Sequence, residues 1–376
     1  MQATDSPLSP PPRRYADLAG WLRLQQVDGV GAVAARALLL RFGNPGAIFS
    51  ASFATLCEVV TAAQAAALLA PAPSPALAAQ LDATLAWLQT PGHAVLTQDD
   101  PAYPANLLEI PDPPVLLYLM GRTELLSRPS LAVVGSRNAS AQGLANAAAF
   151  SRALSDAGLA IVSGLALGID AAAHLGGLAG AASSIAVIGT GADIVYPRRN
   201  HALAHLLAER GCIISEYSPG TPANRANFPR RNRLISGLAR GVLVIEAAAQ
   251  SGSLITARLA ADQGREVFAI PGSIHATLAK GCHALIKQGA KLVETTDDVL
   301  LELNLRPRPA APAAAAAQRA VGDVLLAALG HDPADVDMLA QRSGLDAASV
   351  IGRLLSLELA GLVERLPGGQ FQRTDL

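Results

Sequence analysis

Residues 131–138 read Leu-Ala-Val-Val-Gly-Ser-Arg-Asn, an apolar run that ends in glycine and polar residues. A helix-length stretch follows, and the same pattern recurs down the chain. The apolar runs of this kind are Leu131–Val134, Leu159–Val162, Ile185–Ile188, Cys212–Ile214, Val242–Ile245 and Val267–Ile270. Short apolar strands that alternate with helices are typical of a parallel sheet covered on both faces. We therefore predict an α/β domain with a parallel sheet over residues 93–303.

The chain on either side of this domain has a different composition. Residues 1–15 are rich in proline and indicate a flexible tail, whereas apolar residues at helical spacing in 16–90 predict a small helical domain. Residues 304–318 form a linker of proline and alanine. In 319–376, three helix-length patterns precede a possible hairpin, as in a winged helix. The three patterns span residues 319–329, 335–343 and 347–360.

The composition predicts a soluble protein with a sizeable core. Apolar residues make up 51% of the 376 residues, only 16% are charged, and the formal net charge is −1. Any site for nucleic acid must therefore be a local patch, because no global positive field exists. The three cysteines form neither a CxxC pair nor a disulfide framework, and no signal peptide or transmembrane run is evident. We expect a cytoplasmic location without membrane association.

The loops after the predicted strands are the places to look for a ligand, because open parallel sheets bind ligands beyond the carboxyl ends of their strands. Nearly every predicted strand ends in small residues whose backbone N–H groups lie near the start of a helix and attract phosphate. Several such loops together, with Arg137 in the first, favour a phosphate-bearing ligand. The small residues are Gly135, Ser136, Ser163, Gly164, Gly168, Ser251, Gly252 and Ser253.

Arginine is concentrated in residues 198–240, which hold eight arginines against two glutamates. Within this segment, Phe228-Pro229-Arg230-Arg231-Asn232-Arg233 brings three arginines close to an aromatic residue. A guanidinium group binds phosphate through two hydrogen bonds and stacks on planar groups, so the segment favours a polyanion. Binding should weaken steeply as the salt concentration rises.

Catalytic and metal sites have weaker support. Asp170 and His174 share one helical face, but no third ligand is evident, so helix capping by Asp170 and a packed His174 are preferred. Glu246 follows a strand with no nucleophile–base pair beside it, and Cys282 and His283 are merely adjacent in sequence. No GxGxxG follows the first strand, and no GxxxxGK(S/T) occurs. We predict no enzymatic activity, no cofactor and no metal.

Short motifs follow one another in order over roughly residues 95–295. They are Tyr103-Pro104, Asp112-Pro113-Pro114, Val134 to Arg137, Ser163 to Ala166, Gly168-Ile169-Asp170, Gly189-Thr190-Gly191, Tyr196-Pro197, Ser215-Glu216, Phe228 to Arg233, Ser251 to Ala257, Pro271-Gly272 and Gly281-Cys282. Each motif alone is weak, but the ordered set resembles the DNA-processing protein A (DprA, or Smf) family. Lys280 and His283 depart from the residues that are frequent in that family.

The resemblance implies an extended Rossmann-like domain that binds single-stranded DNA, forms a homodimer and is not an enzyme. It also implies delivery of the strand to the RecA recombinase during natural transformation and DNA recombination. With aromatic residues at only 4% of the chain, we expect contacts to the DNA backbone and little sequence preference.

Carried onto matching positions, the resemblance implies phosphate contacts at arginine side chains and amide donors in the loops. The arginines are Arg137, Arg198, Arg199, Arg231 and Arg233, and the amides are those of Gly135, Gly164, Ser251 and Gly252. Tyr196 and Phe228 are candidates for base stacking. The residues expected at the DNA interface are Gly135, Ser136, Arg137, Ser163, Gly164, Gly168, Arg198, Arg199, Phe228, Arg231, Asn232, Arg233, Ser251, Gly252 and Ser253.

The flanking domains give mixed indications. Val27-Asp28-Gly29-Val30-Gly31 is similar to a helix-hairpin-helix, whose amides can hold a DNA phosphate, and family members have a sterile-alpha-motif-like helical domain here. Contact with DNA and packing against protein stay equal alternatives for it. Residues 319–376 contain five arginines and no lysine against eight acids. Because phosphate contacts dominate DNA affinity, we expect this domain to contact protein, or nothing.

Two other functions stay open as alternatives. A nucleotide-binding enzyme of the phosphoribohydrolase type has a PGGxGTxxE motif on a related fold. Residues 249–254 are the nearest counterpart here, and the catalytic glutamate is missing after them. A nucleotide-sensing regulator would act through the winged helix, and the acidic charge of that domain counts against it.

Overall fold

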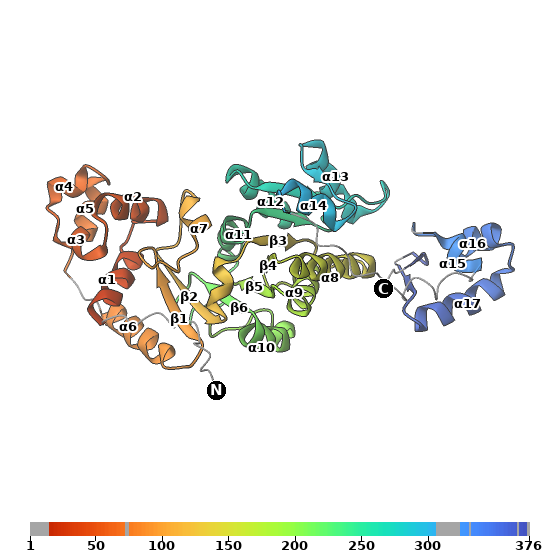
Figure 1. The fold of residues 1–376 in the computed structure, drawn as a ribbon, viewed down its shortest axis with the longest axis horizontal. Helices are drawn as coiled ribbons and strands as arrows, with labels where there is room; N and C mark the ends of the chain where they lie inside the picture. Colours follow the sequence, from red (N-terminus) through yellow and green to blue (C-terminus); the bar gives the residue numbers. More distant parts are fainter. Residues whose placement is uncertain (1–14, 72–74, 306–323, 331, 367, 374–376) are drawn as a thin grey trace, which may run out of the picture.

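The computed structural model describes residues 15–71, 75–305, 324–330, 332–366 and 368–373 (Figure 1). The expected tail at residues 1–15 and linker at 304–318 lie almost entirely outside these ranges. No helix among the described residues is long and apolar enough to cross a membrane.

A nine-stranded sheet with the order β1-β2-β6-β5-β4-β3-β7-β8-β9 forms the centre of the molecule. The seven strands from β3 to β9 pair in parallel, while β1 and β2 add an antiparallel edge next to β6. The strands are His93–Thr97 (β1), Leu116–Gly121 (β2), Ser130–Val134 (β3), Ala160–Ser163 (β4), Ser184–Val187 (β5), Cys212–Ser215 (β6), Gly241–Val244 (β7), Glu266–Ala269 (β8) and Lys291–Leu292 (β9).

The predicted parallel sheet is confirmed. Each of the six apolar runs forms a strand within one residue of its expected limits. The antiparallel edge formed by β1 and β2 was not expected. The chain winds from β3 through β4, β5 and β6 on one side of β3, then returns to β7 on its other side. The direction of winding therefore reverses between β3 and β7, as in Rossmann-like sheets.

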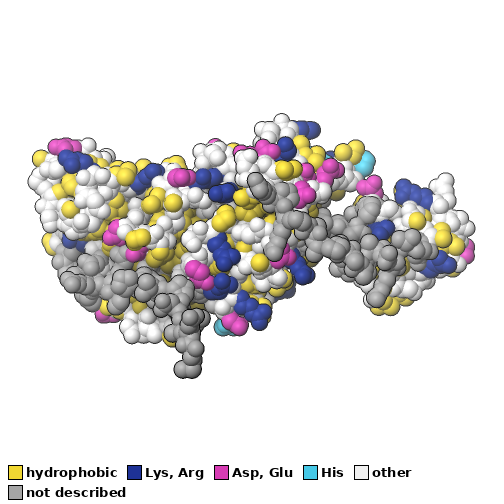
Figure 2. All heavy atoms as spheres, viewed as in Figure 1, with side chains coloured by type: hydrophobic (Ala, Val, Ile, Leu, Met, Phe, Trp, Pro, Cys, Tyr) yellow, Lys and Arg dark blue, Asp and Glu magenta, His cyan; other side chains and the backbone are white. Residues whose placement is uncertain are grey.

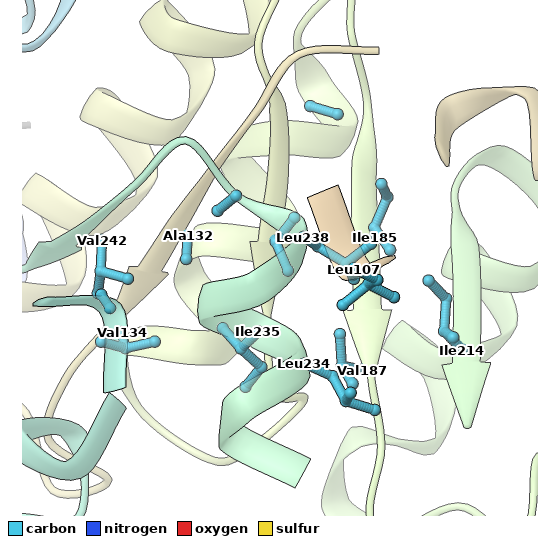
Figure 3. Close-up of a cluster of buried hydrophobic side chains, with 14 of the residues drawn as sticks. Leu107, Ala132, Val134, Ile185, Val187, Ile214, Leu234, Ile235, Leu238 and Val242 are labelled. Carbon is cyan, nitrogen blue, oxygen red and sulfur yellow. The ribbon is translucent and has the colours of Figure 1, made fainter. Parts of the chain in front are cut away.

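Helices cover both faces of the sheet because neighbouring side chains of each strand point to opposite faces. In β3, Ala132 and Val134 lie in a core with α11, α12 and α13, whereas Leu131 and Val133 pack with α8 and α9. Figure 3 shows α11 lying on the first of these faces. The helices are α7 (Ala105–Glu109), α8 (Ala141–Asp156), α9 (Ile169–Ala179), α10 (His201–Arg210), α11 (Asn227–Leu238), α12 (Ser253–Asp262), α13 (Lys280–Lys287) and α14 (Thr296–Glu302).

Within the described residues, six helices precede the sheet, and their core continues into it. Leu22 and Leu38 pack in one apolar cluster with Leu116 and Tyr118 of β2. The Gln25 side chain donates a hydrogen bond of 2.8 Å to the carbonyl of Glu216, just after β6. The helices are α1 (Tyr15–Gln26), α2 (Ala32–Phe42), α3 (Pro45–Ser50), α4 (Phe53–Cys57), α5 (Ala62–Leu68) and α6 (Pro75–Leu88). The helical segment and the β1–β2 edge therefore share one core.

The C-terminal residues form a winged helix with a core of its own (Figure 1). Its elements are α15 (Val324–Leu329), α16 (Val336–Ser343), α17 (Ala347–Leu359), β10 (Val363–Arg365) and β11 (Phe371–Arg373). Asp335 and Asp346 cap α16 and α17 through their side chains. One carboxylate oxygen of Glu364 accepts the amide of Ala141, the first residue of α8, at 2.9 Å.

Candidate nucleic-acid interface

The loops after the neighbouring strands β3 and β4 lie against each other, and β3 adjoins the point, between β3 and β7, where the sheet reverses its winding. Ile169 donates its amide to the carbonyl of Ser136 at 3.1 Å. Gly168 has a φ of +74°, and a Cβ atom there would collide with the carbonyl oxygens of Ser136 and Arg137. Only glycine fits this position, both for its conformation and for the close approach of the two backbones. Arg137 and Asn138, beyond the contact, are exposed.

Three amides of the loop after β4 have internal acceptors. The Asp170 carboxylate accepts the amides of Gly164 at 3.1 Å and Ala166 at 3.3 Å, and His174 accepts that of Leu165 at 3.2 Å. Asp170 therefore binds the loop that precedes α9, while Gly168 is the N-cap of that helix. The expected use of the Gly164 amide as a phosphate donor is wrong in this conformation, because the buried carboxylate of Asp170 already holds it.

The carbonyls of the same loop also have buried partners. Arg231 donates from Nη1 to the Gly164 carbonyl at 2.5 Å and to the Val187 carbonyl at the end of β5. Asn200 donates to the carbonyls of Leu165 at 2.9 Å and Ala166 at 3.0 Å. Leu165 has a φ of +57°, a conformation that costs a non-glycine residue on the order of 1–3 kcal/mol unless its surroundings impose it. The hydrogen bonds from Arg231 and Asn200 hold Leu165 in this conformation.

The charges under the loop follow from burial. Desolvation raises the pKa of Asp170, although the nearby Arg231 charge opposes this effect. Burial, together with Arg231, lowers the pKa of His174 to about 3, so its imidazole is neutral and Nε2 can accept the Leu165 amide. The other ring nitrogen, Nδ1, then donates to the Ser184 hydroxyl at 2.7 Å. Burial lowers the pKa of Arg231 to about 10, so its guanidinium stays charged at neutral pH.

Arg231 and Arg233 do not lie on the surface. They are 4% and 7% exposed, and both point into the protein. Arg233 forms ion pairs with Asp112, at 3.2 Å, and with Glu216, and it donates to the Asp112 carbonyl at 2.7 Å. In α11, Arg231 lies on the same helical face as Leu234, Ile235 and Leu238, at spacings of three, four and seven residues. That spacing is the sequence signal for its burial.

Exposed arginines lie along the carboxyl edge of the parallel strands and make this edge basic. Arg137 follows β3, Arg198 and Arg199 lie in the short 3-10 helix Arg198–Asn200 before α10, and Arg230 lies on the outer side of α11. Figure 2 shows one face of the molecule, on which Lys and Arg side chains lie among Asp and Glu side chains. Sequence reasoning placed Arg230 in the motif but not among the site residues.

An aromatic pair lies beside these arginines. The rings of Tyr196 and Phe228 are 5.3 Å apart between centroids, and Tyr196 is 49% exposed. Phe228 and Asn232 are partly buried. The structure therefore brings together two aromatic residues that lie far apart in the sequence.

The start of α12 contributes few free groups. The Ser251 amide was expected to donate to a DNA phosphate. In the structure it already donates to the Ala248 carbonyl at 3.0 Å, so it is not a free donor. The hydroxyls of Ser251 and Ser253 lie 2.7 Å apart, and Gly252 between them is exposed.

Glu246, Lys280 and His283 have structural contacts. The Glu246 carboxylate accepts the Ser140 amide at 3.0 Å and the Ser140 hydroxyl at 2.5 Å, at the start of α8. Lys280 donates to the Ile274 carbonyl, and His283 lies 2.9 Å from the Gly272 carbonyl. Among the residues with described positions, no group of three or more His, Cys, Asp or Glu side chains is arranged to hold a metal.

Comparison with known proteins identifies related sequences along most of the chain. The family model for DNA recombination-mediator protein A matches residues 94–304, and that for the DprA winged helix domain matches residues 307–369. Protein Smf of Escherichia coli (strain K12) is 43% identical over 298 residues, covering 77% of this chain and 80% of that protein. DNA processing protein DprA of Streptococcus pneumoniae is 50% identical over 203 residues, covering 54% and 72%.

Solved structures agree with this relationship. The X-ray structure of DNA processing protein A from Streptococcus pneumoniae has a TM-score of 0.65 and 37% identity, covering 77% of this chain and 98% of that one. A structure of DNA processing protein A from Helicobacter pylori, described for its single-stranded DNA binding mode, has a TM-score of 0.51 and 29% identity. It covers 56% of this chain and 95% of its own. The chain belongs to the DNA recombination-mediator protein A family, also called DprA or Smf.

Proposed function

We propose that the chain binds single-stranded DNA, with little sequence preference, along the carboxyl edge of the parallel strands. The observation that carries the proposal is the convergence of exposed Arg137, Arg198 and Arg199 on this edge, in loops that follow β3 and β5. Arginine at exposed loop positions suits a phosphate backbone. The relative from Helicobacter pylori, which is described as binding single-stranded DNA, supports the same ligand.

The pair of Tyr196 and Phe228 gives the chain a preference for single-stranded DNA over duplex DNA. Unpaired bases can stack on an exposed aromatic ring, whereas paired bases are already stacked within the duplex. Such stacking contributes about 1–3 kcal/mol per base and tolerates every base. With one such pair and several arginines, phosphate contacts dominate, which is why we expect little dependence on sequence.

Some parts of the predicted interface act indirectly in this proposal. Ser136 and Gly168 set the spacing of the two loops, and Ser163, the last residue of β4, donates its hydroxyl to the Val133 carbonyl at 2.7 Å. Gly252 and Ser253 lie at the start of α12, where the positive end of the helix dipole favours a phosphate.

We further propose that the chain acts as a homodimer in the cytoplasm, is not an enzyme, and delivers the bound strand to the RecA recombinase. The family description as a recombination mediator supports a role in handing DNA to a recombinase. This part is tested by RecA-dependent strand exchange on DNA preincubated with the chain. Faster exchange supports delivery, and unchanged exchange contradicts it.

The central experiment measures fluorescence anisotropy of a labelled oligonucleotide, single-stranded or duplex, across a salt series. We expect preference for the single strand, a steep salt dependence, and at least tenfold weaker binding by Arg137→Ala. Arg152→Ala is the matched control, because Arg152 is an exposed arginine near the far end of α8 that pairs with Asp156 at 4.0 Å. Equal binding to duplex, or equal losses in both variants, would contradict the proposal.

A further inference from the structure

Two neighbouring arginines of α11 have opposite environments. Arg230 is exposed, whereas Arg231 is 4% exposed and lies under the loops that follow β4 and β5. Its Nη1 atom donates to the carbonyl of Gly164 at 2.5 Å and to that of Val187. A single guanidinium thus joins the carboxyl ends of two adjacent parallel strands.

The fit between Arg231 and Gly164 is close. A Cβ atom at Gly164 would lie 2.6 Å from Nη1 and 2.8 Å from the guanidinium carbon. Glycine at this position is therefore explained by the buried arginine. The guanidinium lies in the space that a side chain of residue 164 would need.

Arg231 belongs to a set of buried side chains that hold the backbone of residues 164–166. Asp170 and His174 accept its amides, while Asn200 and Arg231 donate to its carbonyls. The same loop ends at Gly168, whose backbone lies directly against Ser136 and Arg137. A change in the loop after β4 is therefore passed on to the backbone that carries Arg137.

We propose that Arg231 is a positioning residue, which sets the loop behind Arg137 and does not itself contact the DNA strand. The inference rests on the proposed binding of single-stranded DNA at this edge. The arginine motif suggests that Arg231 contacts a phosphate. We expect no such contact, because its guanidinium donates to two carbonyl groups inside the protein.

Salt dependence separates a positioning role from direct contact. Each phosphate neutralised on a single strand adds about 0.7 to the slope of log affinity against log salt concentration. Removal of a direct contact therefore lowers both the affinity and the slope. Removal of a positioning residue lowers the affinity with little change in the slope, so long as the other arginines still reach the strand.

The experiment compares Arg231→Lys, Arg231→Gln and Arg137→Ala by anisotropy across a salt series, after circular dichroism has shown that each is folded. We expect Arg137→Ala to reduce the slope by about 0.7. Both Arg231 variants should lose roughly tenfold or more in affinity at an unchanged slope. Lysine should not rescue binding, because a point charge cannot reproduce the planar fork of donors between two carbonyls.

If the Arg231 variants do not fold, a variant at Asn200 tests the positioning of the same loop with no loss of charge. Asn200→Ala removes the donors to Leu165 and Ala166 and leaves every arginine in place. It should weaken binding at an unchanged slope. A slope reduced by the Arg231 variants as much as by Arg137→Ala, full rescue by lysine, or wild-type affinity in all loop variants would overturn the inference. Absence of binding by the wild-type chain would instead reject the proposed function.

Discussion

The parallel sheet and the winged helix are both folds that other proteins use to bind nucleic acid, yet here they differ in charge. Residues 198–240 hold eight arginines against two acids, whereas residues 319–376 hold five against eight acids. On the winged helix, α17 exposes Ile351, Leu355 and Leu359 at 55%, 57% and 82%. From this difference in charge we expect the side chains on the presented surface, more than the fold, to decide which region binds DNA.

The largest effect should come from reversing the charge of the sheet edge. Arg198→Glu with Arg199→Glu removes two cations and adds two anions beside the proposed strand path. We expect affinity for single-stranded DNA to fall about a hundredfold or more, since a hydrogen bond to a charged group contributes roughly 1.5–3 kcal/mol. Anisotropy at fixed salt measures it. Arg152→Glu is the control, and a comparable loss there would show that overall charge, not the site, governs binding.

The second prediction concerns stability and uses the buried histidine of the sheet region. The pKa of His174 is lowered to about 3 in the fold, so the unfolded chain takes up the proton first, near pH 6.5. Stability should therefore fall as the pH drops from about 6.5 toward 3, by up to about 1.4 kcal/mol per pH unit from this group. His174→Gln, whose side-chain oxygen can still accept the Leu165 amide, should flatten this dependence.

Denaturant unfolding of the wild type and His174→Gln at several pH values checks the prediction. The burial of Asp170 raises its pKa and acts in the opposite direction, so the difference between the two proteins is the relevant quantity. Parallel stability curves for the two proteins would contradict the assignment of this pH dependence to His174.

The smallest effect should come from removing the winged helix. A chain ending at residue 305 should bind single-stranded DNA within about twofold of the full chain, because the acidic domain offers few phosphate contacts. The same anisotropy assay applies. A tenfold loss would break the comparison and place part of the DNA affinity in the winged helix.

Much of the fold could be predicted from the sequence because its parallel strands are buried on both faces. Such strands are continuous apolar runs, and all six that were expected occur. The antiparallel pairing of β2 with β6 was not predicted, since an apolar run carries no information about the direction of its neighbour. In the winged helix, the helix patterns at 335–343 and 347–360 match α16 and α17, and part of the pattern at 319–329 lies outside the described residues.

For the candidate site, the sequence indicated which loops to examine, whereas it could not show the contacts of the individual side chains. The sequence indicated the apolar strands and the small residues that follow them, and the strand order seen in the structure brings these loops to one edge. The inward direction of Arg231 depends on the phase of α11, and the bonds of Asn200 reach residues more than thirty positions away. The contacts of Asn200 arise from tertiary packing. The four-residue motif alone does not show which arginines reach the solvent, although the apolar residues three, four and seven positions after Arg231 indicate its burial.

The shared core of the N-terminal helices and β2 has a consequence for shortened versions of the chain. A fragment that begins after α6 would leave Leu116 and Tyr118, which are fully buried in the whole chain, without their cover. In this chain α1 to α6 therefore cover apolar surface of β2, and removal of these helices would expose that surface. The winged helix has an apolar core of its own, so its removal would leave the cores of the sheet covered.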